Sequence, residues 1–268
     1  ETMMFRIRKI LDSVSPANQD AVKQVAEILR AQFPKARAAE FEKLPEQLND
    51  PLRYRYRSVM FVAEDGTGKL KGFAMMLHLT DIGVAYLELI SAAPRRTGGG
   101  VGGALYERVR DEALSLGVKG LFYECSVDEP HLVSDPKTLE QNIARMKFYE
   151  KYGARPITNN DYATPVHPGD QDLYYLVMDG LGQDLPLALN DAHRIVRAIL
   201  ERKYSDVIPQ SQIDEVVASF QDDPAVLRLP RYSRRRSAGK TKPRPTVGAI
   251  GLTVNEGHSI HHVKAKGY

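Results

Sequence analysis

The sequence contains a single cysteine and no long apolar run, and each scarcity limits what kind of protein it can be. Cys125 has no partner for an internal disulfide, so stability must come from packing, which fits a reducing compartment. No stretch approaches the roughly 20 consecutive apolar residues that a membrane span needs. The N-terminus also lacks the charged-then-apolar pattern of a secretory signal. We therefore expect a cytoplasmic protein without a membrane segment.

The sequence also lacks a large excess of either positive or negative charge. The 37 lysine and arginine residues nearly balance the 34 acidic ones, which leaves a formal net charge of +3. So small an excess decides little about partners. A chain of 268 residues with 43% hydrophobic and 26% charged residues is long enough for a sizeable core, or for one domain with an appendage.

Hydrophobic periodicity and turn signals predict a mixed order of strands and helices up to residue 182. Strands are expected at 5–12, 58–64, 69–79, 84–92, 120–127 and 174–179. Helices are expected to start at Ser15-Pro16 and to cover 38–49, with an interruption at Pro45, then 104–116 and 138–152, before Gly153. This order predicts an α/β fold with a mixed sheet.

The pattern changes after Gly182, which divides the chain into 1–182 and an extension at 183–268. Helical spacing covers 187–204 and 211–220, so the extension is predicted to be mostly helical. Residues 231–245 then form a basic stretch with few hydrophobic residues, typical of a linker. Two short strand-like runs follow before Tyr268, from which we expect the natural chain to continue.

Glycines crowd residues 98–103, between a predicted strand and a predicted helix. Without side chains, the backbone N–H groups of such a loop can converge on an anion at the positive end of the helix dipole. A Walker loop is excluded, because no Gly-Lys-Ser/Thr follows. A dinucleotide fingerprint would need an acidic residue about 20 positions later, where Glu124 stands, so glycines alone leave this alternative and a plain tight connection open.

The segment from Ala92-Ala93-Pro94 through Thr97 to Leu105 resembles the coenzyme A pyrophosphate loop of the GNAT acetyltransferase superfamily, Arg/Gln-x-x-Gly-x-Gly/Ala. Gly100 and Gly102 match this pattern, and Thr97 replaces the Arg or Gln. A register starting at Arg95 restores the arginine but loses the Ala-Leu that follows. Arg95 or Arg96 could supply the missing charge.

A second segment resembles the family's Asn-x-x-Ala-Ile-x-Leu-Tyr-Glu-Lys-x-Gly helix. It runs from Asn142 through Tyr149 to Gly153, with Arg145 in place of the small residue. The two motifs follow in the family's order, and the resemblance covers about residues 3–180. It implies a GNAT fold that binds acetyl-CoA and acetylates a primary amine. The coenzyme-binding residues that it implies are Ile90, Ala92, Thr97, Gly98, Gly99, Gly100, Val101, Gly102, Gly103 and Asn142.

Direct acetyl transfer needs a base for the amine and an acid for the thiolate. The resemblance implies Tyr149 as the acid, unless this ring only packs against the sheet. Glu88 and Glu124 are carboxylates in otherwise apolar strands, where burial would raise the pKa toward that of a base. Either could instead face solvent at an edge. Glu88 ranks first, because the family often uses that strand.

Asp128 and Glu129 follow the strand that contains Glu124 and could attract a cationic amine, or could belong to an ordinary polar loop. Cys125 would be a nucleophile only with an acetyl-enzyme, which the family does not use, so we interpret it as a core residue. The candidate acceptor is thus a small-molecule or lysine-like amine.

The C-terminal region offers two further candidates that we reject. The basic residues 231–244 have only Tyr232 for stacking on bases, so we interpret them as a solvated linker rather than a contact for nucleic acid. His258, His261 and His262 lack further ligands apart from Glu256, so no metal is expected.

Residues 222–232 resemble the connector of bacterial proteins that join a GNAT module to a histone deacetylase-like amidohydrolase. The resemblance implies a covalently linked deacetylase-like domain in a bifunctional fusion. An alternative function is therefore a non-catalytic, acetyl-CoA-binding regulatory module.

Overall fold

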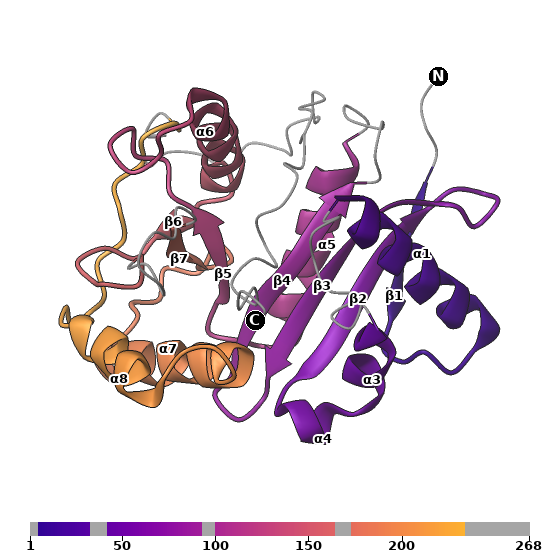
Figure 1. The fold of residues 1–268 in the computed structure, drawn as a ribbon, viewed down its shortest axis with the longest axis horizontal. Helices are drawn as coiled ribbons and strands as arrows, with labels where there is room; N and C mark the ends of the chain where they lie inside the picture. Colours follow the sequence, from indigo (N-terminus) through magenta and orange to yellow (C-terminus); the bar gives the residue numbers. More distant parts are fainter. Residues whose placement is uncertain (1–4, 33–41, 93–99, 164–172, 234–268) are drawn as a thin grey trace, which may run out of the picture.

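The computed structural model describes residues 5–32, 42–92, 100–163 and 173–233. These residues form a seven-stranded sheet in the order β1-β2-β3-β4-β5-β7-β6, with helices packed around it (Figure 1). All neighbouring strands are antiparallel except β4 and β5, which are parallel. The predicted α/β class with a mixed sheet is confirmed.

The strands have the bounds Arg6–Ile10 (β1), Arg57–Glu64 (β2), Leu70–Leu79 (β3), Val84–Ala92 (β4), Leu121–Ser126 (β5), Arg155–Pro156 (β6) and Tyr174–Asp179 (β7). The helices are Pro16–Gln32 (α1), Leu44–Asn49 (α3), Pro51–Tyr54 (α4), Val101–Ser115 (α5), Pro136–Glu150 (α6), Leu189–Tyr204 (α7) and Gln210–Ser219 (α8). Each agrees with its predicted range to within a few residues, apart from three.

The three exceptions have local causes. Pro45 does not interrupt a helix, because it lies in the first turn of α3, where a missing N–H costs nothing. Strand β6 was not predicted, since two residues carry no periodicity. The third is α4, whose four residues are too short for a helical pattern. The strands expected near 246–263 lie outside the described residues.

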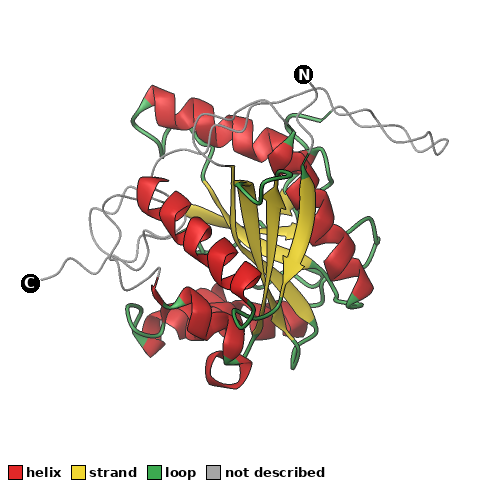
Figure 2. Ribbon diagram, turned by 90° about the vertical axis from the view of Figure 1, so that its right-hand side faces the viewer, coloured by secondary structure: helices red, strands yellow, loops and turns green. Residues whose placement is uncertain are grey.

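Each face of the sheet has its own apolar core. On one face, α1, α3, α7 and α8 pack on side chains such as Met60, Tyr86 and Phe122. On the other, α5 and α6 cover side chains such as Phe61 and Tyr123. Figure 2 shows helices on both sides of the strands. Because both faces are buried, the central strands read as nearly continuous apolar runs rather than as alternating ones.

Strands β4 and β5 run together only at their beginnings. They pair at Ala85 with Leu121 and at Tyr86 with Phe122, and further along they separate, as Figure 1 shows. We call the segments after Tyr86 and Phe122 the β4–β5 divergence. It begins beside a β-bulge, where Met75 and Met76 of β3 pair with Leu89 and Leu87, so that Glu88 is the additional residue. The bulge and the divergence together break the sheet at one place.

The extension shares the core of the sheet. Ile195, Val196 and Ile199 of α7 belong to the same apolar cluster as the β-sheet residues. Residues 225–233 are here called the strap. The strap lies beside β6, because the backbones of Val226 and Arg228 form hydrogen bonds with residues in or next to that strand. The division at residue 182 stays a prediction. Among the described residues, no helix has the length and apolar character needed to cross a membrane.

Candidate active site

The start of α5 presents backbone amides without a side-chain cap. Gly100, which precedes the helix, has a φ of 71°, a left-handed conformation that glycine adopts without strain. No side chain caps the helix start and no acidic residue lies in the first turn. The N–H groups of this turn and the positive end of the helix dipole therefore favour an anion.

Apart from Asn142 on α6, the described residues predicted to bind the coenzyme lie around this helix start. Gly100, Val101, Gly102 and Gly103 form it, and Ile90 and Ala92 lie at the adjacent end of β4. Thr97, Gly98 and Gly99 lie outside the described residues, as do Arg95 and Arg96.

Gly72 of β3 permits the close approach of α5 to the sheet. A Cβ there would lie 2.7 Å from the carbonyl oxygen of Ser91 and 2.9 Å from Cγ1 of Val101. Sequence reasoning missed this residue. A glycine inside an apolar strand run was the available signal, because such a glycine often marks a close backbone approach.

Glu88 lies at the β-bulge, on the face covered by α7. Its Oε1 is 3.3 Å from Nζ of Lys203 in α7. Its Oε2 is buried and has no hydrogen-bond partner among the described residues. The side chain is 24% exposed, so Glu88 does not occupy a fully solvent-facing edge position, and its role as a base stays a prediction.

Glu124 lies on β5, across the divergence from Glu88 and on the same face. Its Oε1 accepts a hydrogen bond of 2.7 Å from the Tyr162 hydroxyl, and its Oε2 accepts one of 2.5 Å from the Tyr204 hydroxyl. Burial, followed by the nearby Glu124 charge, raises the pKa of both phenols well above the ordinary value. Both tyrosines therefore keep their protons and hold this carboxylate in place.

Tyr149 lies on the opposite face of the sheet. Its ring packs 4.6 Å from that of Tyr123 and 5.1 Å from that of Tyr106, between centroids. Burial raises the pKa of the Tyr149 phenol, so the group stays protonated at neutral pH. Burial likewise raises the pKa of the neighbouring Cys125 thiol to about 12, which agrees with a core residue rather than a nucleophile.

Three of the predicted site residues form hydrogen bonds or ion pairs with other residues of the chain. The Asn142 amide donates a hydrogen bond of 2.8 Å to the Val127 carbonyl at the end of β5. Both oxygens of Asp128 accept from the Arg228 guanidinium of the strap, at 2.6 and 2.9 Å, and Glu129 pairs with Arg231 at 2.6 Å. Their contacts with coenzyme or amine stay predictions.

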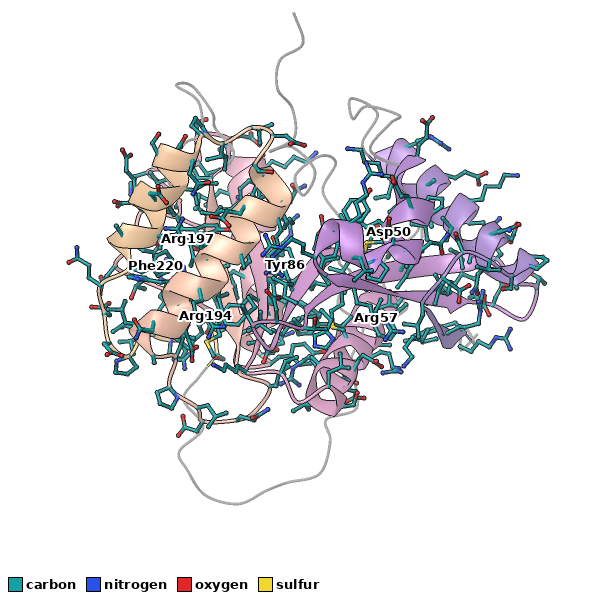
Figure 3. All side chains as sticks on the ribbon, turned by 90° about the horizontal axis from the view of Figure 1, so that it is seen from below. Asp50, Arg57, Tyr86, Arg194, Arg197 and Phe220 are labelled. Atoms are coloured by element: carbon teal, nitrogen blue, oxygen red, sulfur yellow. The ribbon has the colours of Figure 1, made fainter. Side chains whose placement is uncertain are left out.

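Sequence reasoning missed the contribution of α7. Arg202 and Lys203 in its last turn are expected on an exposed helix end, where basic residues favour the dipole. A signal did exist, because Lys203 stands four residues after Ile199 and so continues the buried stripe of the helix. Figure 3 places Tyr86 between α7 and the sheet.

No group of three or more potential ligands for a metal ion occurs in the described part of the chain. The candidate site therefore consists of an uncapped helix start, two carboxylates that flank the strand divergence, and a protonated phenol on the other face. This arrangement can bind an anion at one end and move protons at the other.

The chain was compared with known families and structures. The model of the Acetyltransferase (GNAT) family matches residues 22–154. None of the curated proteins compared with the chain matches it in sequence. An aminoglycoside 6'-N-acetyltransferase complexed with coenzyme A has 18% identity and a TM-score of 0.51, over 67% of this chain and 99% of that one.

Two further solved structures are similar at lower scores. A GNAT-family acetyltransferase from Desulfovibrio desulfuricans has 18% identity and a TM-score of 0.47, over 67% of this chain and 100% of the other. A spermidine N-acetyltransferase chimera from Vibrio cholerae has 17% identity and a TM-score of 0.46, over 66% and 95%. The family model, with the fold, decides the assignment: residues 22–154 form a domain of the acetyltransferase (GNAT) family.

Proposed function

We propose that the chain transfers an acetyl group from acetyl-CoA directly to a primary amine. The observation that carries this proposal is the alignment of the uncapped α5 start with the β4–β5 divergence, at the end of β4. The backbone amides of Val101, Gly102 and Gly103 would hold the diphosphate. Because the strands separate, an extended arm could pass between them and present its thioester to both faces of the sheet.

Glu88 is the proposed base and Tyr149 the proposed acid. One oxygen of Glu88 already faces an amine and the other is buried without a partner among the described residues, which supports a group that accepts a proton from nitrogen. Tyr149 is protonated at neutral pH and so carries the proton that the departing thiolate would take. The two act from opposite faces, so they can serve one reaction only through the divergence.

Glu124 remains the alternative base. Two tyrosine hydroxyls donate to its oxygens, so both oxygens already have partners within the chain. We therefore assign it to the positioning of Tyr162 and Tyr204. A fall in turnover of Glu124→Gln that exceeds the fall in Glu88→Gln would reverse this ranking.

The competing function is a non-catalytic module that binds acetyl-CoA and regulates another domain. One observation favours it, because Lys203 and Tyr204 of α7 occupy the two glutamates. An amine substrate would have to displace them.

Calorimetry with CoA and acetyl-CoA, followed by thiol release with a panel of amines, separates these functions. Glu88→Gln and Tyr149→Phe should each lower kcat by about 10²-fold or more while coenzyme binding stays intact, because each loses a proton-transfer group. Glu140→Gln, at an exposed position of α6, is the matched control. Binding without turnover on any amine would favour the regulatory module, and absence of binding would exclude both.

A further inference from the structure

Three consecutive residues at the end of α7 attach this helix across the β4–β5 divergence. The Arg202 guanidinium binds both oxygens of Asp81, in the β3–β4 turn, at 2.8 and 2.5 Å. Lys203 contacts Glu88 on β4, and Tyr204 donates to Glu124 on β5. Since the neighbours Lys203 and Tyr204 each bind one of the separating strands, the helix end spans the divergence.

The Lys203 ammonium lies in a site built for a cation. Its Nζ is 3.3 Å from Oε1 of Glu88, 4.1 Å from the centroid of the Tyr86 ring and 5.2 Å from that of Tyr204. The side chain is only 10% exposed. A carboxylate and two aromatic faces are the groups that recognise an alkylammonium. The site therefore binds a primary amine of this chain in the position that an acceptor amine needs, against the proposed base.

This amine comes from outside the family-matched segment, because residues 22–154 end before α7 begins. The family fold contributes Glu88 and the divergence, and the extension contributes the lysine. From this juxtaposition we infer that Lys203 is an acetylation site of the chain's own acetyltransferase centre. The inference rests on the proposed function and adds an acceptor to it.

The reaction balances within the groups named. The Lys203 ammonium releases one proton to Glu88, and its nitrogen lone pair then forms a bond with the acetyl carbon of acetyl-CoA. The carbon–sulfur bond breaks, and the departing sulfur takes a proton from Tyr149. The nitrogen loses a second proton as the amide forms; this proton restores the Tyr149 phenol through solvent, and Glu88 passes its own proton to solvent. The product is a neutral acetyl-lysine, which forms no ion pair with Glu88, so acetylation removes the lysine contact that covers the base.

Exposure distinguishes this reaction from chemical acetylation. Acetyl-CoA modifies lysines without a catalyst according to their access to solvent, which favours Lys119, whose side chain is 47% exposed and pairs with Asp191 at 2.7 Å. Lys203, at 10%, should react more slowly on that basis. Catalysis by the site reverses the order.

The test uses the full chain, incubated with acetyl-CoA and no other amine, and follows acetylation of each lysine by peptide mass spectrometry. Lys203 should be modified at least on the order of 10²-fold faster than Lys119, since a positioned general base contributes that much. The advantage should disappear in Glu88→Gln and persist in Glu140→Gln. Modification of Lys119 ahead of Lys203 would overturn the inference.

A second arm separates this inference from the proposed function. Lys203→Met keeps the apolar stem and removes the acceptor nitrogen, and n-butylamine matches the lost side chain. If Lys203→Met acetylates n-butylamine while Lys203 stays unmodified in the unaltered chain, the inference fails and the proposed function stands. If coenzyme binds but neither Lys203, nor n-butylamine, nor any amine of the panel is acetylated, both fail. If Lys203 and n-butylamine are both acetylated, and saturating n-butylamine slows the modification of Lys203, the inference and the proposed function are both supported.

Discussion

At the scale of single residues, Gly72 determines how closely α5 approaches the sheet. The position has no room for a side chain. Two groups lie too near, the Ser91 carbonyl and the side chain of Val101, which is the first residue of α5. Gly66, in the β2–β3 turn, has no atom within 4 Å of a Cβ placed there. The two glycines therefore form a natural comparison.

We expect Gly72→Ala to lower the free energy of unfolding by about 1–3 kcal/mol, since overpacking forces the neighbouring backbone to shift. Gly66→Ala should change it little. Equilibrium denaturation of both variants measures this. Coenzyme affinity, measured by calorimetry, should fall only in Gly72→Ala, and equal stabilities of the two variants would contradict the packing argument.

A second residue-scale feature is the buried carboxylate of Asp179. It accepts from the Tyr106 hydroxyl at 2.8 Å, from Nε of Arg110 at 2.7 Å and from the backbone N–H of Leu181 at 2.7 Å. Asp179 is 0% exposed, so every lost bond leaves a buried polar group. The group links α5 to the end of β7.

Asp179→Ala should destabilise the chain by about 3–5 kcal/mol, because it leaves the partly buried Arg110 charge without its carboxylate and the buried Tyr106 hydroxyl without this acceptor. Asp161→Ala, an exposed position, is the control. Thermal unfolding followed by circular dichroism gives the difference. Similar midpoints for the two variants would show that the Asp179 network contributes nothing.

At the scale of elements, the strap is held by three carboxylates, Asp128, Glu129 and Glu150. Glu150 of α6 accepts from the backbone N–H groups of Arg231, Tyr232 and Ser233, at 3.1, 2.7 and 2.7 Å. Burial alone would raise the pKa of Glu150, but these bonds to the charged form outweigh it, and the pKa lies below its ordinary value. The strap therefore depends on an ionised Glu150.

This dependence predicts how pH acts on the strap. The pKa of Glu150 is lower in the folded chain than its ordinary value of 4.5, so the ionised carboxylate contributes its full stabilisation of the fold above pH 4.5. This contribution is lost as the pH falls below 4.5 and through the pKa of the folded state. Hydrogen exchange, corrected for its intrinsic pH dependence, should show the amides of residues 231–233 losing protection there. The Arg228 amide, which donates to the Pro156 carbonyl, should keep it longer. Simultaneous loss would refute the role of Glu150.

At the scale of the whole molecule, α7 and α8 complete one face of the sheet. Ile199 of α7 is 1% exposed within the cluster that also contains Met60 and Phe122. An extension that shares a core in this way cannot unfold alone without exposing the strands beneath it. Leu185, before α7, is 56% exposed and contributes no such contact.

Ile199→Ala should therefore lower the global stability by about 2–5 kcal/mol, whereas Leu185→Ala should lower it little. Unfolding followed by circular dichroism and by tyrosine fluorescence should give one coincident transition in both variants. An early separate transition in Ile199→Ala would mean that α7 and α8 unfold independently.

Local pattern was enough for much of this fold, and it selected the helix start that we propose as an anion site. The strands at 84–92 and 174–179 were predicted with their observed bounds, because apolar runs limited by turn residues determine a strand locally. The glycines around Gly100 indicated an anion site for a similar reason: a bare backbone before a helix has the same chemistry in any context.

What only the tertiary structure decided is the surroundings of each carboxylate. Glu88 and Glu124 could be selected from the sequence, but their contacts with Lys203 and Tyr204 join residues far apart in the chain. Asp128 and Glu150 likewise accept hydrogen bonds from residues of the strap. Such pairings follow from how the extension folds back on the sheet, and no local spacing encodes them, because burial and partner are properties of the packed molecule.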